Sequence, residues 1–102
     1  MQMNEQQIEN DIQAKDLIAP RITPDSIDAL IVGEQYYVFP NTTTTICLLH
    51  LANGYTVTGE SACVSSSNFD EEIGRHIARS NARDKIWSLE GYLLRNTLTM
   101  MG

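Results

Sequence analysis

Three arginines recur at every fourth position in the stretch GRHIARSNARDKIW. They are Arg75, Arg79 and Arg83, and Lys85 follows them closely. On an α-helix, residues four apart lie on one stripe, so this spacing gathers the three guanidinium groups on one face. A guanidinium binds carboxylate or phosphate oxygens through paired N–H donors. The stripe therefore predicts either a network of ion pairs or a site for an anionic ligand.

The three arginines differ in the partners that their own helix offers. Arg75 follows Glu71 and Glu72 by one turn and can form an ordinary surface ion pair. Arg79 and Arg83 have no acidic residue three or four positions away. Like charges at this spacing destabilise an isolated helix by roughly 0.2–0.5 kcal/mol per pair. The partners of these two arginines must come from another segment, another subunit or a bound anion.

The segment before the stripe is rich in short polar side chains. Hydroxyls and amides precede the expected helix, whose free N–H groups favour anions. Phe69 or Tyr55 offers a ring on which a base can stack. The stripe and this loop together predict a ligand-binding set: Ser61, Ser67, Asn68, Phe69, Arg75, Arg79, Arg83 and Lys85. The alternative is structural, with acids of the N-terminal segments docked against the arginines in an ion-pair network.

No comparable pattern supports catalysis or metal binding. His50 stands between two leucines and is expected to be a hydrogen-bonded structural histidine, whereas His76 is expected on a solvated helix face. The sequence has no nucleophile motif, and Cys47 and Cys63 lack the spacing of metal ligands. We therefore expect no catalytic residue, no metal and no cofactor. A phosphodiesterase that uses either histidine is a remote alternative.

The net charge of −6 and its distribution limit the partners. Residues 1–74 hold 11 acids and 2 bases, whereas residues 75–102 hold 2 acids and 5 bases. An acidic chain is poorly suited to a nucleic-acid polymer, which is bound through many phosphate contacts, but a local positive field can bind one small anion. No apolar run is long enough to cross a bilayer, and the first residues lack the pattern of a signal peptide. These features predict no membrane contact and a cytosolic location.

The pattern along the chain predicts an α+β fold in a single domain, with residues 1–20 as a peripheral N-terminal helix and residues 21–102 as the core. Helix-forming residues fill positions 4–17. Thr23 then caps a short helix with a proline at its first position, and this helix ends near Gly33. A core of this size is modest, so a homo-oligomer, dimer or larger, is expected.

β-branched and aromatic residues from Glu34 onwards predict strands, and Asn53-Gly54 predicts the turn of a central antiparallel hairpin. If only these two residues form the turn, the expected pairs are Ala52 with Tyr55, His50 with Val57, Ile46 with Ser61, and Thr44 with Cys63. This register puts Cys47 and Cys63 on opposite faces of the sheet, where no disulfide can join them.

A long helix should follow the hairpin and cover the small sheet. Asn68 and Glu71 fit a capping box at its start, and it continues to about Lys85 or beyond, with Gly91 as a potential break. Helical spacing turns a line of apolar residues toward the sheet: Ala78, Ala82, Ile86, Leu89 and Leu93, with Trp87 and Tyr92 also in the core.

Almost the whole chain from Ala19 to Leu94 resembles a family of small tailed-phage accessory proteins, the gene-forty-nine or gene-sixty-six type. The likeness rests on "NGY", "ESACV", "NFD" followed by a helix, and "KIWSLEGY". This type is similar to phage proteins that antagonise the Thoeris defence system, in which bacterial TIR enzymes make a cyclic ADP-ribose isomer as an alarm signal. The resemblance implies an oligomeric sponge in the host cytoplasm that binds the signal without cleaving it. Some such proteins also hold cyclic di- or trinucleotides at a separate site.

Two functions from different classes follow. The first is a phage anti-defence protein that sequesters a cyclic nucleotide through the ligand-binding set, because the pyrophosphate, adenine and ribose call for arginines, a stacking ring and short polar donors. The alternative is a phage host-takeover protein that inhibits a host protein by direct contact, with its acidic N-terminal half imitating the charge of nucleic acid.

Overall fold

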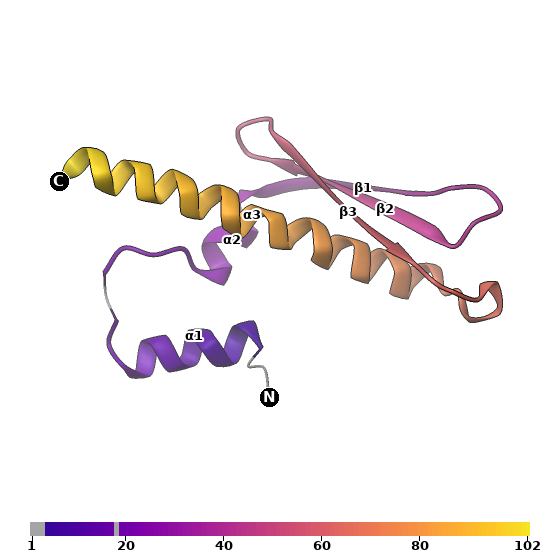
Figure 1. The fold of residues 1–102 in the computed structure, drawn as a ribbon, viewed down its shortest axis with the longest axis horizontal. Coiled ribbons are helices and arrows are strands. Elements are labelled where there is room, and N and C mark those ends of the chain that lie inside the picture. Colours follow the sequence, from indigo (N-terminus) through magenta and orange to yellow (C-terminus); the bar gives the residue numbers. More distant parts are fainter. Residues whose placement is uncertain (1–3, 18) are drawn as a thin grey trace.

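The computed structural model describes residues 4–17 and 19–102, and within them a three-stranded antiparallel sheet lies against one long helix (Figure 1). The strand order is β1-β2-β3. The predicted α+β class, with a long C-terminal helix on a small sheet and helices before it, is confirmed. In chain order the elements are α1 (Glu5–Ala14), α2 (Pro24–Leu30), β1 (Ile31–Val38), β2 (Thr44–Leu51), β3 (Thr56–Ala62), the short 3-10 helix η1 (Ser66–Asn68) and α3 (Glu71–Met101).

Both N-terminal helices begin with a capping box, and α2 is capped by Thr23 as predicted. Asn4 closes a capping box with Gln7 at the start of α1, and Thr23 closes one with Ser26 at the start of α2. The predicted end of the second helix near Gly33 is wrong, because β1 already begins at Ile31. The β-branched residues after Leu30 pair with β2, so the helix stops three residues early.

The central hairpin turns through three residues, so the predicted two-residue turn is wrong. The N–H of Leu51 bonds to the carbonyl of Tyr55 at 2.9 Å, and the N–H of Gly54 bonds to the carbonyl of Leu51 at 2.9 Å. Gly54 has a φ of 91°, whereas Asn53 keeps a negative φ and accepts the N–H of Tyr55 on its side chain at 2.9 Å. A two-residue turn of the expected type needs positive φ at both of its central residues.

The longer turn moves the register by one residue from the prediction. His50 pairs with Thr56, not with Val57; Ile46 pairs with Glu60, and Thr44 with Ala62. A slip of one residue transfers every side chain of a strand to the other face. The observed register places Leu49 opposite Val57, and both are buried under α3. The predicted register would have opposed Leu49 to the polar Thr58.

The two cysteines are free, as expected, but for another reason. Cys47 pairs with Gly59, and the N–H of Cys63 bonds to the hydroxyl of Thr43 at 3.2 Å. In this register the alternation of side chains puts both cysteines on the same face, so the predicted opposition is wrong. They stay apart because four residues of extended chain, about 13 Å, separate Cys47 from the position opposite Cys63.

The long helix α3 differs from the prediction at its start and in its continuity. Asp70, not Asn68, is the N-cap, and its carboxylate accepts the N–H of Ile73 at 3.0 Å. The predicted capping box of Asn68 with Glu71 is therefore wrong, since Asn68 ends η1. The helix also passes through Gly91 without a break, because one glycine weakens a helix but does not end it.

Only the first half of α3 covers the sheet. Ala78, Ala82 and Ile86 are fully buried, as predicted, and Trp87 packs partly against the core. Three further residues predicted in the core are exposed: Leu89 at 41%, Leu93 at 57% and Tyr92 at 73%. A helix of 31 residues is about 46 Å long, whereas strands of seven or eight residues span about 26 Å. The C-terminal half, yellow in Figure 1, therefore runs past the end of the sheet.

Candidate functional site

Arg79 forms an ion pair with a carboxylate from the sheet. Its Nε donates to Glu34 of β1 at 2.7 Å, 45 residues away in the chain. Glu34 shares the α3-facing side of β1 with Tyr36, because residues two apart on a strand point to the same face. The hydrogen bond from Arg79 holds the pKa of Glu34 below its ordinary value of 4.5. The anion that faces Arg79 is thus part of the chain itself.

Arg83 binds two carboxylates at once. Its Nη1 and Nη2 donate to Glu5 of α1 at 2.7 and 2.8 Å, and its Nε donates to Asp28 of α2 at 2.7 Å. The side chain of Arg83 is only 15% exposed. These hydrogen bonds, first of all those that Arg83 donates to Glu5, raise the pKa of Arg83. Arg83 therefore fastens both N-terminal helices to α3.

Arg75 has the weakest attachment of the three arginines. Its pair with Glu71, predicted from the helical spacing, is 3.2 Å long and exposed on both sides. Its guanidinium carbon also lies 6.0 Å from the centre of the Tyr36 ring. Burial is the main cause that raises the pKa of Tyr36 to about 12, so this ring remains a neutral phenol at neutral pH.

The arginine stripe thus has the geometry of the structural alternative, an ion-pair network. The partners that sequence reasoning did not identify are Glu5, Asp28 and Glu34. The contrast between an acidic N-terminal region and a basic stripe indicated that such partners exist. It did not indicate which acids they are, because each of these pairs joins segments that are remote in the chain.

A pocket of about 220 Å³ lies at the amino end of α3, and we call it the α3 amino-end pocket. It brings together three residues of the predicted ligand-binding set: Ser61, Asn68 and Phe69. The Ser61 hydroxyl donates to the carbonyl of Gly74 at 2.7 Å, which fixes the end of β3 against the first turns of α3. Gly74 is buried here. An added Cβ at Gly74 would lie 3.5 Å from Phe69 and 2.9 Å from the hydroxyl of Thr45.

The other members of the predicted set lie outside this pocket. Ser67 is exposed, and its hydroxyl bonds to that of Ser65 at 2.8 Å. Lys85 borders a separate depression of about 100 Å³ beside β3. Arg75, Arg79 and Arg83 follow α3 away from the pocket toward β1 and the N-terminal helices. The structure therefore divides the eight predicted residues among four places.

The histidines have the surroundings of structural residues. His50 Nε2 lies 2.8 Å from Gln35 Oε1 on the neighbouring strand, in agreement with the prediction of a hydrogen-bonded histidine. His76 is exposed on α3. Across residues 4–17 and 19–102, no group of three or more His, Cys, Asp or Glu side chains is placed to hold a metal ion. No helix in the same ranges is long and apolar enough to cross a membrane.

Comparison with known proteins gives one match. The model of the family described as "Phage protein (N4 Gp49/phage Sf6 gene 66) family" matches residues 22–98. No curated protein and no solved structure matches the chain. The matched region takes in both the α3 amino-end pocket and the arginine stripe, whereas α1 lies outside it.

Proposed function

The chain belongs to the phage protein (N4 Gp49/phage Sf6 gene 66) family, and we propose that it is an anti-defence protein that binds and sequesters a cyclic nucleotide signal without cleaving it. The proposed ligand is a cyclic ADP-ribose isomer of Thoeris, with cyclic di- and trinucleotides as related ligands. One observation carries this proposal: the α3 amino-end pocket combines an aromatic ring, a hydroxyl and an amide in one concave site.

Each of these groups suits one part of a nucleotide. The Phe69 ring can stack on a base, and base stacking on an aromatic side chain contributes about 1–3 kcal/mol. The Asn68 amide can donate to and accept from a base edge, and the Ser61 hydroxyl can accept from a ribose hydroxyl. Sequestration requires only such contacts in a preformed pocket, with no general base.

The phosphates of the ligand need positive charge, which a second subunit can supply. Among the described residues that line the pocket none is basic, and Asp70 adds a negative charge. Arg79 and Arg83 would have to give up bonds of 2.7–2.8 Å to carboxylates before they bound a phosphate. We therefore propose a homo-oligomer, dimer or larger, in which a cation of a second copy completes the site.

Calorimetry with cyclic ADP-ribose isomers and cyclic dinucleotides tests this function. We expect binding at micromolar concentrations or tighter, and Phe69→Ala should weaken it by roughly tenfold or more, since one stacked ring is lost. Ser67→Ala is the matched control, because Ser67 belongs to the same loop but lies outside the pocket. Absence of binding across the panel, or equal losses in the two variants, would contradict the proposed site.

The fate of the bound ligand distinguishes a sponge from an enzyme. The complex is heated to unfold the protein, and the released ligand is analysed by mass spectrometry. We expect the intact cyclic molecule at the stoichiometry measured by calorimetry. Recovery of a linear or hydrolysed product would assign the protein to a hydrolytic class instead.

The second candidate is inhibition of a host protein by direct contact. The C-terminal half of α3 favours it, because exposed apolar side chains on a protruding helix are typical of protein interfaces: Leu89, Tyr92, Leu93, Met100 and Met101. A pull-down from host lysate that yields one stoichiometric host partner, with no bound nucleotide, would support this function over sequestration.

Imitation of nucleic-acid charge has weaker support within that second candidate. Several acids of the N-terminal half already form ion pairs inside the molecule: Glu5, Glu9, Asp11, Asp28 and Glu34. A paired carboxylate presents less negative potential to a partner than a free one. A host contact through the apolar face of α3 therefore fits this structure better than charge imitation.

A further inference from the structure

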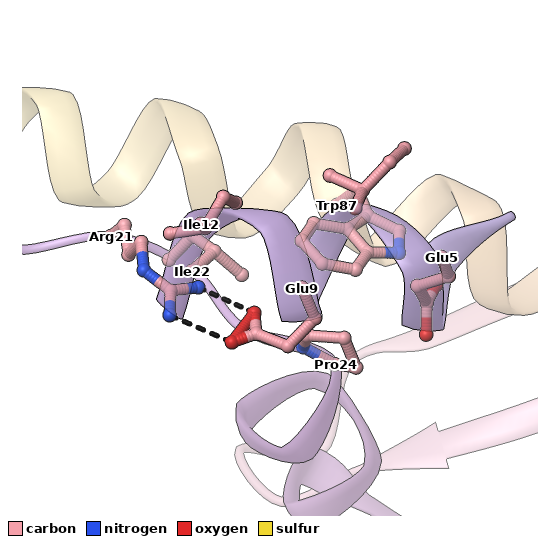
Figure 2. A pocket seen from close by; sticks show the side chains of 8 residues that line it. Glu5, Glu9, Ile12, Arg21, Ile22, Pro24 and Trp87 are labelled. Carbon is pink, nitrogen blue, oxygen red and sulfur yellow. Dashed lines mark hydrogen bonds and ion pairs between the residues drawn. The ribbon is translucent and has the colours of Figure 1, made fainter. Parts of the chain in front are cut away.

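The helix α1 runs alongside α3, and an apolar space lies between them (Figure 2). This space, which we call the α1 cavity, has a volume of about 360 Å³. Ile8 and Ile12 of α1 form one wall, Ile22 and Pro24 form another, and Trp87 of α3 forms the third. The indole ring of Trp87 faces the cavity beneath α1 (Figure 2).

The charged groups at the border of the α1 cavity neutralise one another. Glu9 accepts two hydrogen bonds from Arg21 at 2.6 and 2.7 Å, drawn as dashed lines in Figure 2. Glu9 is only 8% exposed, and its hydrogen bonds with Arg21 lower its pKa. At the other end, Glu5 is paired in the same two-pronged way with Arg83. The cavity is therefore apolar inside and is bordered by these two ion pairs.

These ion pairs also explain why the space is not filled. The ion pairs of Arg21 and Arg83 keep α1 about one arginine side chain away from its neighbours. Ile8 therefore lines the cavity and yet remains 45% exposed. An apolar space in a protein stays without firmly held water when it offers water no polar partners, and it can then take up an apolar molecule. Its volume falls in the range of small-molecule sites.

We propose that the α1 cavity is a binding site for a small neutral aromatic molecule, which packs against the ring of Trp87. A charged molecule is disfavoured because both carboxylates and both guanidiniums at the border already have partners, so its charge would be desolvated without compensation. An aromatic ring gains from contact with the indole beyond the area that it buries.

This site is separate from the one proposed for the nucleotide. Trp87 follows Gly74 of the α3 amino-end pocket by 13 residues, which corresponds to about 20 Å along the helix. The lining residues of the α1 cavity and of the α3 amino-end pocket do not overlap. Failure of either proposal therefore leaves the other intact.

Tryptophan fluorescence of the full-length protein tests the proposal, because Trp87 is its single tryptophan. The probes are benzyl alcohol, benzylammonium and benzoate, which have similar size and carry no charge, a positive charge and a negative charge. We expect benzyl alcohol to change the Trp87 emission saturably in the millimolar range, which is typical of so small a ligand, and to raise Tm. Both ions should bind roughly tenfold or more weakly. No saturable change with benzyl alcohol, or equal binding of all three probes, would overturn the proposal.

Two variants of Ile8 locate the binding. Ile8→Asp should abolish it by placing a charge in the wall, and Ile8→Phe should weaken it by filling the space while Trp87 remains the single tryptophan. Leu17→Asp is the matched control, because Leu17 is an exposed apolar residue of the same N-terminal segment that does not line the cavity. Circular dichroism verifies that each variant is folded, and Ile8→Phe provides the test if the charged variant unfolds. Undiminished binding in a folded Ile8 variant, or equal loss in Leu17→Asp, would refute this location.

Discussion

Gly59 shows how closely α3 approaches the sheet. A Cβ built at this position would lie 2.2 Å from the N of Ala82 and 2.3 Å from the O of Ala78, both backbone atoms of α3. Backbone atoms of a buried helix cannot move aside as a flexible side chain can. The side-chain-free glycine on β3 and the two alanines on α3 together allow this contact.

We predict that Gly59→Ala lowers the free energy of unfolding by about 3 kcal/mol or more, because the methyl group forces helix and strand apart. Gly91→Ala is the matched control: an added Cβ there meets nothing within 4 Å, and alanine should stabilise the helix interior by roughly 0.5–1 kcal/mol. Urea unfolding measures both values. Similar effects of the two substitutions would show that α3 does not pack on β3 this tightly.

At single residues, the sequence predicted local chemistry better than long-range pairing. It distinguished Arg75, which has an acid on its own helix, from Arg79 and Arg83, which have none. The hairpin register was missed because the side chain of Asn53 bonds to the N–H of Tyr55. This bond favours a three-residue loop, and the sequence Asn-Gly alone does not distinguish the two turns.

Among the elements, α1 and α2 both form ion pairs with Arg83 of α3. We predict that Arg83→Ala leaves Glu5 and Asp28 without a partner and weakens the docking of α1 by about 1–3 kcal/mol, the usual effect of removing one partner of a hydrogen-bonded charge. Hydrogen exchange followed by mass spectrometry should show faster exchange in α1, while the amides of β2 keep their protection.

Arg75→Ala is the control for this experiment, since Arg75 is paired only within α3 and should leave α1 unchanged. If Arg83→Ala does not accelerate exchange in α1, then apolar contacts and not the ion pairs hold this helix. The same result would remove the physical basis for an open α1 cavity.

The pair between β1 and α3 gives a prediction for pH. In the folded state Arg79 lowers the pKa of Glu34 below 4.5, so Glu34 binds a proton more readily in the unfolded state. The ion pair therefore stabilises the fold at pH values above 4.5. Its contribution is lost as pH falls through the lowered pKa of the folded state. We expect Glu34→Gln to be less stable than the unmodified protein near neutral pH, and the difference to shrink as pH falls below 4.5 and through the lowered pKa of Glu34.

Urea unfolding at several pH values measures this difference. Glu72→Gln is the control for the loss of one acidic side chain, because Glu72 forms no ion pair among the described residues. The pairing of Arg79 with Glu34 would be contradicted if the difference in free energy of unfolding between Glu34→Gln and the unmodified protein did not change with pH.

The starts of α1 and α2 depend on more local signals than the end of α2 and the buried length of α3. Asn4 and Thr23 bond to backbone N–H groups only three residues away, so the signal is local. The end of α2 depends on pairing of β1 with a strand that follows it, and the buried length of α3 depends on where the sheet stops. Helical periodicity does not contain this information, which is why Leu89 and Leu93 were expected in the core.

At the scale of the whole molecule, folding brings the acidic and basic parts of the chain together. Residues 1–74 carry 11 acids against 2 bases, and residues 75–102 carry 5 bases against 2 acids. The contacts of Arg79 and Arg83 join these two regions directly. The uneven distribution of charge, which suggested a bound anion, is therefore explained at the arginine stripe by ion pairs within the chain. The α3 amino-end pocket is the remaining place for a ligand among the residues of the predicted set.

The C-terminal half of α3 carries exposed apolar side chains that the other described segments leave uncovered. Leu89, Leu93 and Met100 lie on one line of the helix at intervals of four and seven residues, and all three are exposed. Contiguous apolar patches larger than a few hundred Å² are rare on monomers, and a helix that projects without packing is only marginally stable in water. A second copy that packs against this line would stabilise the helix and supply the subunit contact that we propose for nucleotide binding.

We predict that the protein has a mass in solution larger than that of one chain, and that Leu93→Glu converts it to a monomer with reduced helix content. Light scattering after size-exclusion chromatography measures the mass, and circular dichroism measures the helix. Thr99→Glu is the matched control, because Thr99 is an exposed polar residue of the same helix segment that lies off the Leu89–Met100 line. If the unmodified protein is a monomer, or if Leu93→Glu keeps its larger mass, α3 does not mediate self-association. Its exposed face would then be free for a host protein, which is the condition that inhibition by direct contact requires.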